Sequence, residues 1–170
     1  LMNLLRKIFK ASPKPTADGA FSPSPLAIKL GTSSKTDYDG GAYADPYKGE
    51  RDKVLMVCTE ECNMTMANGK KFLTGNHPVE MGLPMLHLIN AGFEINVVTP
   101  TGAPVAIEMW AMPADDADVQ KLFSDYADAF EKPGSLAEFV ANEMDARNDY
   151  AAVYIPGGHG AMLGLPDNAD

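Results

Sequence analysis

Three short apolar runs, separated by stretches with helical periodicity, constrain the fold of this chain more than any other feature. The runs are Lys53–Thr59, Phe93–Thr99 and Ala151–Ile155. Continuous apolar runs of this length are typical of strands that are covered on both faces of a parallel sheet. We therefore expect all three runs to be buried strands.

The segments between these runs are expected to supply three helices and one further strand. Pro78 is suited to the first position of a helix that Gly92 ends, although Pro84 inside it should introduce a kink. Ser135 is a good N-cap, with Glu138 three residues later as in a capping box. The expected helices cover residues 78–91, 116–130 and 135–146, and a short strand is expected over residues 105–109. This order predicts an α/β sandwich around a mostly parallel sheet.

Residues 1–52 differ in composition from residues 53–170 and are expected to form an N-terminal arm. Over residues 1–11, apolar side chains recur at helical spacing among Arg and Lys residues, which indicates a short amphipathic helix. Such a helix docks on a partner, frays or lies on a membrane surface, and we favour the first two. Residues 12–52 are rich in Pro, Ser and Gly and should be extended. Their aromatic residues are expected to pack on the body: Phe21, Tyr38, Tyr43 and Tyr47.

The composition excludes several classes of protein. The chain has 170 residues and a net charge of −9, which argues against a nucleic-acid patch because phosphate binding needs clustered Lys and Arg. No apolar run approaches the length of a membrane span. The two cysteines, Cys58 and Cys62, cannot form a disulfide framework and are expected to be reduced, in a cytoplasmic setting.

A glycine-rich turn follows the last apolar run, where Pro156 is succeeded by Gly157, Gly158, His159 and Gly160. A strand that ends in glycines and turns into a helix leaves backbone N–H groups open above the sheet. Such groups can bind an anion or a developing oxyanion. The alternative is a plain turn that uses glycine for its positive φ. The His159 side chain would face either the site or solvent.

Glu80 would lie in the first turn of the helix that starts at Pro78. A glutamate there either caps its own helix or acts as a proton donor and acceptor beside a nucleophile. His77 and His87 are either structural or act as ligands or bases. Because the reactive site of a parallel sheet lies at the carboxyl ends of its strands, Cys58, the loop before Pro78 and the glycine-rich turn should converge.

No catalytic constellation is complete within these residues. The chain contains no Gly-x-Ser-x-Gly elbow, no His-Glu-x-x-His pair and no cysteine followed by histidine. An oxyanion hole and a carboxyl group without a nucleophile would make only part of an active site.

Several motifs taken together resemble the ThiJ/PfpI superfamily. Within it they resemble the HchA-like branch of heat-shock chaperones, which are also described as glyoxalase III and as protein and nucleic-acid deglycases. In the body, the motifs are Thr74–Glu80, Leu83-Pro84, Ala91–Glu94, Glu108–Pro113 and Tyr150–Gly160. In the arm, they are Ser22-Pro23, Asp39-Gly40 and Pro46–Gly49. The resemblance implies a flavodoxin-like sandwich with a cap, working as a homodimer.

The resemblance also implies that a part of the active site lies elsewhere. The nucleophile of the family is a cysteine in a Cys-His-Gly-Pro turn, one strand beyond the Gly-Gly-His-Gly turn. That position would lie past Asp170. We therefore expect that the C-terminal strands are missing from this chain, that the sheet has an exposed apolar edge, and that a complementary C-terminal segment completes it.

The resemblance assigns roles to individual residues. Glu80 matches the glutamate that shuttles the substrate proton, Gly158 matches the glycine whose N–H helps to form the oxyanion hole, and His159 lies near this site. Glu94 matches the carboxylate of a metal site in this branch. Ile89 and Tyr126 stand where that site has histidines, so no metal is expected there.

The implied activity needs no cofactor. It is the conversion of methylglyoxal to lactate, or the removal of early glyoxal adducts from glycated side chains. A rival is a holdase chaperone that binds unfolded clients, and a third possibility is a non-catalytic fragment that folds only with its complement.

Overall fold

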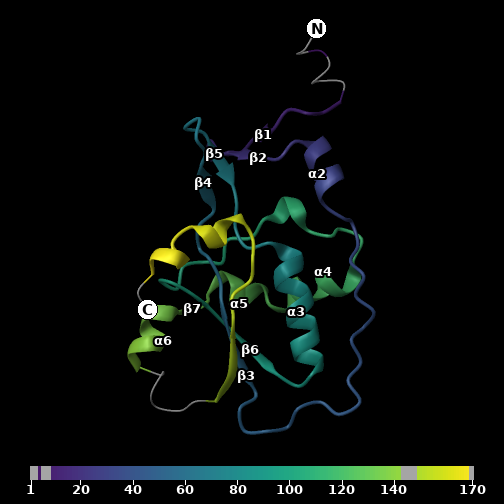
Figure 1. The fold of residues 1–170 in the computed structure, drawn as a ribbon, viewed down its shortest axis with the longest axis vertical. Helices are drawn as coiled ribbons and strands as arrows, with labels where there is room; N and C mark the ends of the chain where they lie inside the picture. The colour runs from purple at the N-terminus through teal and green to yellow at the C-terminus, as the bar shows by residue number, and fades with distance from the viewer. Residues whose placement is uncertain (1–3, 5–8, 143–148, 169–170) are drawn as a thin grey trace.

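A four-stranded parallel sheet forms the centre of the molecule (Figure 1). The computed structural model describes residue 4, residues 9–142 and residues 149–168. The strands lie in the order β7-β6-β3-β8 and every neighbouring pair is parallel. Their bounds are β3 Lys53–Val57, β6 Glu94–Thr99, β7 Gly134–Ser135 and β8 Tyr150–Tyr154. The expected α/β sandwich with a mostly parallel sheet is confirmed.

Helices cover both faces of this sheet, as Figure 1 shows for α3 and α4 on one side and α6 on the other. Alternate side chains of a strand point to opposite faces. Val54 and Met56 therefore join the larger core cluster with Met81 of α3, whereas Leu55 contributes to the second cluster, against Leu136 of α6. The helices are α3 Pro78–Asn90, α4 Ala117–Asp125, α5 Ala127–Glu131 and α6 Leu136–Asn142.

Strand β8 corrects one expectation from the sequence. Residues 151–155 were expected to be a buried strand, and β8 does form there, but Val153 is 63% exposed and Ile155 is 58% exposed. The reason is its position, because β8 pairs only with β3 within the described part of the chain and forms an outer edge. An exposed apolar edge is therefore present, as the family resemblance implied.

A second, smaller sheet adjoins the first and was not expected from the sequence. It has the order β1-β2-β5-β4, with β1 Lys14–Pro15, β2 Phe21–Ser22, β4 Asn63–Thr65 and β5 Lys71–Leu73. Strands β4 and β5 form a hairpin, closed by the Asn68-Gly69 turn with Gly69 at φ 76°. Strands of two or three residues are too short to leave a periodic signal.

The arm is more structured than its composition indicates. The expectation that residues 12–52 are wholly extended is wrong, because α2 covers Pro25–Gly31 and the Ser24 hydroxyl accepts the Ala27 N–H at 3.1 Å. Tyr47 stacks on Phe93 with ring centroids 5.0 Å apart. The other aromatic contacts of the arm join Tyr38 to His87, Tyr43 to His87 and Phe21 to Lys70. The expected packing of these aromatic residues is confirmed.

Other boundaries are partly as expected. The helix from Pro78 and the strand after Phe93 are confirmed. The expected strand over residues 105–109 is wrong, because that segment makes only an isolated bridge at Ile107 and then the 3-10 helix η1, Met109–Ala111. The helix expected over residues 116–130 is divided at Tyr126 into α4 and α5. The remaining 3-10 helices are η2 His159–Met162 and η3 Leu165–Asp167.

Two expectations fall largely or partly outside the described residues. These are the amphipathic helix over residues 1–11 and the last turn of the helix expected to reach residue 146. Within the described ranges, no helix combines the length and the apolar character that a membrane span needs.

Candidate functional site

The candidate site lies where the order of the parallel sheet reverses. From β3, the chain proceeds through β6 to β7 on one side of the sheet, and then returns to place β8 on the other side of β3. Ligand sites of open α/β sheets lie beyond the carboxyl ends of the strands at such a point. A ligand site is therefore expected among the residues that follow β3 and β8.

Asn76 ties the loop before α3 to the end of β3. Its side chain is fully buried, accepts the Thr59 N–H at 3.1 Å, and donates to the carbonyls of Thr59 at 3.0 Å and Ala106 at 2.7 Å. Three bonds to backbone groups satisfy this buried amide and fix the loop. The loop before Pro78 therefore meets the end of β3, as the parallel-sheet argument predicted.

The glycine-rich turn after β8 is fastened to the same loop. The His77 N–H donates to the Gly157 carbonyl at 2.8 Å, and the Gly160 N–H donates to the Gly75 carbonyl at 2.9 Å. The Gly157 carbonyl and the Gly158 N–H belong to one planar peptide, so the His77 bond also sets the direction of the Gly158 N–H. Among the described residues, no acceptor lies at that N–H.

Gly158 must be glycine for two reasons. Its φ is 126°, which L-residues rarely adopt. A β-carbon built on it would lie 2.5 Å from both the Gly75 oxygen and the His77 nitrogen. The alternative of a plain glycine turn explains the positive φ, but this turn also packs its backbone against the loop that leads into α3, the helix that carries Glu80.

Glu80 lies beside this turn. A β-carbon built on Gly157 would overlap the Glu80 Oε2 atom, so the carboxylate occupies the space above the Gly157 α-carbon. The Glu80 side chain makes no hydrogen bond with any residue that the structure describes, and the capping alternative is therefore not observed. The Tyr154 hydroxyl donates to the Glu80 carbonyl. Burial, followed by the negative charge of Glu80, raises the pKa of Tyr154 above its usual value.

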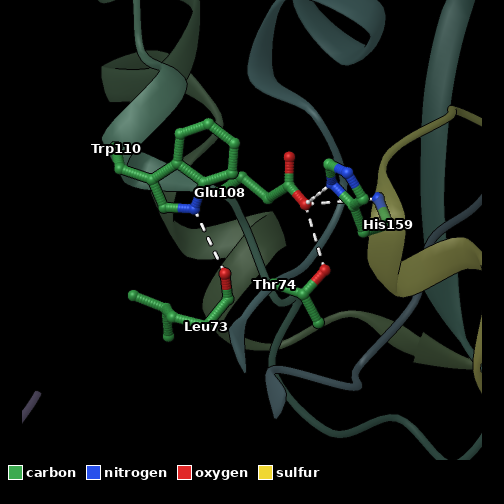
Figure 2. Close-up of polar contacts among 5 residues, drawn as sticks. All are labelled: Leu73, Thr74, Glu108, Trp110 and His159. Atoms are coloured by element: carbon green, nitrogen blue, oxygen red, sulfur yellow. Dashed lines mark hydrogen bonds and ion pairs between the residues drawn. The ribbon is translucent and has the colours of Figure 1, made fainter. Parts of the chain in front are cut away.

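His159 points away from this carboxylate toward another one, Glu108. Figure 2 shows the Glu108 Oε1 atom accepting from the His159 Nδ1 at 2.8 Å, the His159 N–H at 3.2 Å and the Thr74 hydroxyl at 3.0 Å. Glu108 is fully buried, whereas the His159 side chain is 49% exposed. The rings of Phe72 and Trp110 lie 5.4 and 6.4 Å from the His159 ring.

The cysteines of the chain are poor candidates for the nucleophile. Cys58 is fully buried at the end of β3, and burial raises the pKa of its thiol to about 12. Only a thiolate is strongly nucleophilic, so Cys58 is unreactive in the folded protein. Cys62 is exposed, and both cysteines are free, as expected.

The other two histidines have different surroundings. His87 contacts the arm, with its Nδ1 atom 3.2 Å from the Tyr43 hydroxyl, which favours the structural alternative. His77 occupies the N-cap position of α3, and its Nδ1 atom is buried without a partner among the described residues. A cavity of about 330 Å³ adjoins His77, between residues 31–37 of the arm and Leu83 of α3.

The residues that match the family's metal site do not form a ligand cluster. Glu94 is exposed on β6, and Ile89 packs against the core cluster. Burial, followed by the charge of Glu94, raises the pKa of the Tyr126 phenol. No group of three or more His, Cys, Asp or Glu side chains in the described ranges could hold a metal ion. The expectation of no metal here stays a prediction.

Two of the residues that shape the site were not identified from the sequence. In the sequence, Glu108 and Asn76 belong to motifs of the family resemblance, but neither residue has a predicted role of its own. Their partners lie far away in the chain, since Glu108 binds residues 34 and 51 positions distant. The local sequence offers one indication of a special role for Glu108, because it is a single charged residue in an otherwise apolar stretch.

Comparison with known proteins identifies relatives of this chain. The chain is 47% identical over 160 residues to a protein of Pseudomonas aeruginosa (strain LESB58) named protein/nucleic acid deglycase HchA, covering 92% of this chain. It spans about half the length of the curated relatives it matches, 55% in this case. No family model matches the chain.

Solved structures show the same fold. The X-ray structure of Rapid Encystment Protein 24 KDa from Francisella tularensis matches with a TM-score of 0.54 and 25% identity, over 69% of this chain and 49% of that protein. Glyoxalase III from Candida albicans matches with a TM-score of 0.50 and 25% identity, over 69% of this chain and 48% of that protein. The fold is that of the flavodoxin-like ThiJ/PfpI proteins, and the chain belongs to the HchA-like branch of the ThiJ/PfpI superfamily.

Proposed function

We propose that this chain supplies the glutamate and the oxyanion-hole donor of a glyoxalase III or deglycase site. The cysteine nucleophile of that site would come from a complementary C-terminal segment. The observation that carries the proposal is the contact between the Glu80 carboxylate and the turn that holds Gly158, at the reversal point of the sheet. The names of the relatives, a deglycase and a glyoxalase III, support this class of reaction.

The chemistry follows from the two groups. A cysteine thiolate would attack the aldehyde carbon of methylglyoxal to give a hemithioacetal. Glu80 would carry a proton from that carbon to the neighbouring one, which converts the hemithioacetal to a thioester, and water would release lactate. The Gly158 N–H would donate to the oxygen on which negative charge develops. No cofactor takes part in these steps.

The same site would act on early glyoxal adducts of side chains. In such an adduct, the former aldehyde carbon carries a hydroxyl group and the side-chain nitrogen or sulfur. The same thiolate would attack that carbon, the bond to the side chain would break, and the side chain would leave protonated. The hemithioacetal that remains would then follow the same steps. The exposure of Glu80 supports access by a side chain of another protein. The proposed setting is the cytoplasm, which fits two free cysteines.

The test is the formation of D-lactate from methylglyoxal by the intact protein. Glu80→Gln should lower kcat at least about a hundredfold, because a group that transfers a proton contributes about that much. Glu131→Gln, on the exposed end of α5, is the matched control and should retain activity. Activity in Glu80→Gln equal to that of the control would remove Glu80 from the mechanism.

The dependence on a complement has its own test. Residues 1–170 alone should give no turnover, and addition of the C-terminal segment that carries the Cys-His-Gly-Pro turn should restore it. Turnover by residues 1–170 alone would contradict the proposed division of the site.

A holdase chaperone is a second candidate function, supported by the exposed apolar side chains at the β8 edge. These are Val153 and Ile155, each more than half exposed. Such a patch can bind apolar segments of unfolded clients. Suppression of client aggregation that Glu80→Gln leaves intact, and that Val153→Asp removes, would support this function.

A further inference from the structure

Glu108 is a buried acidic residue that the proposed reaction does not use. Its side chain is 0% exposed, and its Oε2 atom has no hydrogen-bond partner within the described part of the chain. Three donors converge on Oε1 instead (Figure 2). Burial of a carboxylate is unfavourable unless its bonds compensate, so a role for this arrangement is expected.

Two of the three donors belong to the residue that follows Gly158. The His159 N–H and Nδ1 both reach the Glu108 Oε1 atom. The peptide before Gly158 is held by the His77 bond to the Gly157 carbonyl. Gly158 is thus a flexible residue between two anchored peptides, and Glu108 anchors the one on its C-terminal side.

The surroundings of the pair keep it in place. Trp110 follows Glu108 by two residues, and its Nε1–H donates to the Leu73 carbonyl at 3.2 Å. Leu73 precedes Thr74, the third donor to Glu108. The Trp110 bond therefore ties η1, which begins directly after Glu108, to the end of β5, next to Thr74 (Figure 2).

We propose that Glu108 is a positioning residue. Its two bonds to His159 fix the peptide on the C-terminal side of Gly158, and so keep the Gly158 N–H in the direction that the His77 bond to Gly157 gives it. The proposal rests on the proposed function of Gly158 as an oxyanion donor. Glu108 touches no reacting atom in this scheme. Its bonds prevent the peptides on the two sides of Gly158 from rotating relative to each other. This restraint is needed because a glycine has no preference of its own for a φ of 126°.

The test uses Glu108→Gln in the intact protein, because glutamine keeps the shape of the side chain and removes its charge. The Gly158 and His159 amide signals in a ¹H–¹⁵N spectrum should shift, and exchange protection of the His159 N–H should fall about tenfold. For methylglyoxal, kcat should fall about tenfold or more while KM changes less than about threefold.

Two further variants keep the proposal testable if Glu108→Gln folds poorly. His159→Phe alters an exposed side chain, retains the backbone bond and should lower kcat by an intermediate factor. Thr99→Val removes a hydroxyl that is equally buried and bonds the Ala103 carbonyl at 2.8 Å, away from the turn. It controls for loss of stability and should leave kcat and the Gly158 signal unchanged.

The outcomes separate this proposal from the proposed function. Wild-type values of kcat, or an unmoved Gly158 signal, in both Glu108→Gln and His159→Phe would overturn the positioning role. If the wild-type protein does not convert methylglyoxal, the proposed function fails. The amide signals then still decide whether Glu108 anchors the turn.

Discussion

Strands β3 and β8 are neighbours in one sheet, have five residues each and are both apolar, yet their surroundings are opposite. β3 lies between β6 and β8 and is buried from Val54 to Val57. β8 has β3 as its only strand partner in the described ranges, and its Val153 is 63% exposed. Similar sequences thus occupy the most protected and one of the least protected positions in the sheet.

This difference explains how the candidate site is held. The end of β3 is fixed by burial and by Asn76. The turn that follows β8 leaves an exposed edge strand, so its position depends on hydrogen bonds to the loop before α3 and to Glu108. One side of the site is therefore held by packing, and the other by a few polar contacts.

The largest difference between the strands should appear on truncation of their side chains. Met56 is 0% exposed, so Met56→Ala should destabilise the protein by about 2–5 kcal/mol. In residues 1–170 without the proposed complement, Val153→Ala on β8 should change the free energy of unfolding by no more than about 0.5 kcal/mol. Urea unfolding of both variants measures these values, and equal losses would mean that β8 is covered in solution.

Gly158→Ala should have the next largest effect. The added methyl group would collide with the Gly75 and His77 backbones at a φ that alanine avoids, costing about 1–3 kcal/mol. Gly31→Ala is the control, because nothing lies within 4 Å of a β-carbon there. Thermal unfolding that gives the same Tm for both variants would show that the turn after β8 is not held against the loop.

A further effect appears only at alkaline pH and concerns the end of β3. Burial raises the pKa of the Cys58 thiol from about 9 to about 12. Between these two values the thiol stays protonated in the folded state, whereas it ionises to the thiolate in the unfolded state. The contribution of this thiol to stability is complete below pH 9, falls by about 1 kcal/mol near pH 10, and is fully lost by about pH 12. In Cys58→Ala, this component of the alkaline loss should disappear. An identical pH dependence in both proteins would show that Cys58 is not buried.

The core of the fold was predictable because its signals are local and long. The runs that became β3 and β6, and the helix from Pro78, have the length and boundaries that patterns detect. The convergence of the loop before Pro78 with the glycine-rich turn followed from the general geometry of parallel sheets. The roles of Glu80, Gly158 and His159 came from the family resemblance and stay predictions.

The remaining features depend on contacts between distant residues. The apolar run at residues 151–155 does not reveal whether other elements cover it, so the exposure of Val153 could not be read from it. The hairpin strands β4 and β5 have three residues each and leave no periodic signal. The role of Glu108 cannot be predicted from its neighbours in the chain, because it depends on hydrogen bonds from the distant residues His159 and Thr74.

The central claim is that Glu80 and the turn after β8 form one site, and Gly157→Ala tests it most directly. The added methyl group would displace the end of a flexible side chain, the Glu80 carboxylate, rather than the backbone. We expect the intact protein to keep its Tm within a few degrees, while kcat for methylglyoxal falls at least about tenfold. An unchanged kcat in Gly157→Ala, with the fold intact, would contradict the claim that Glu80 acts at this turn.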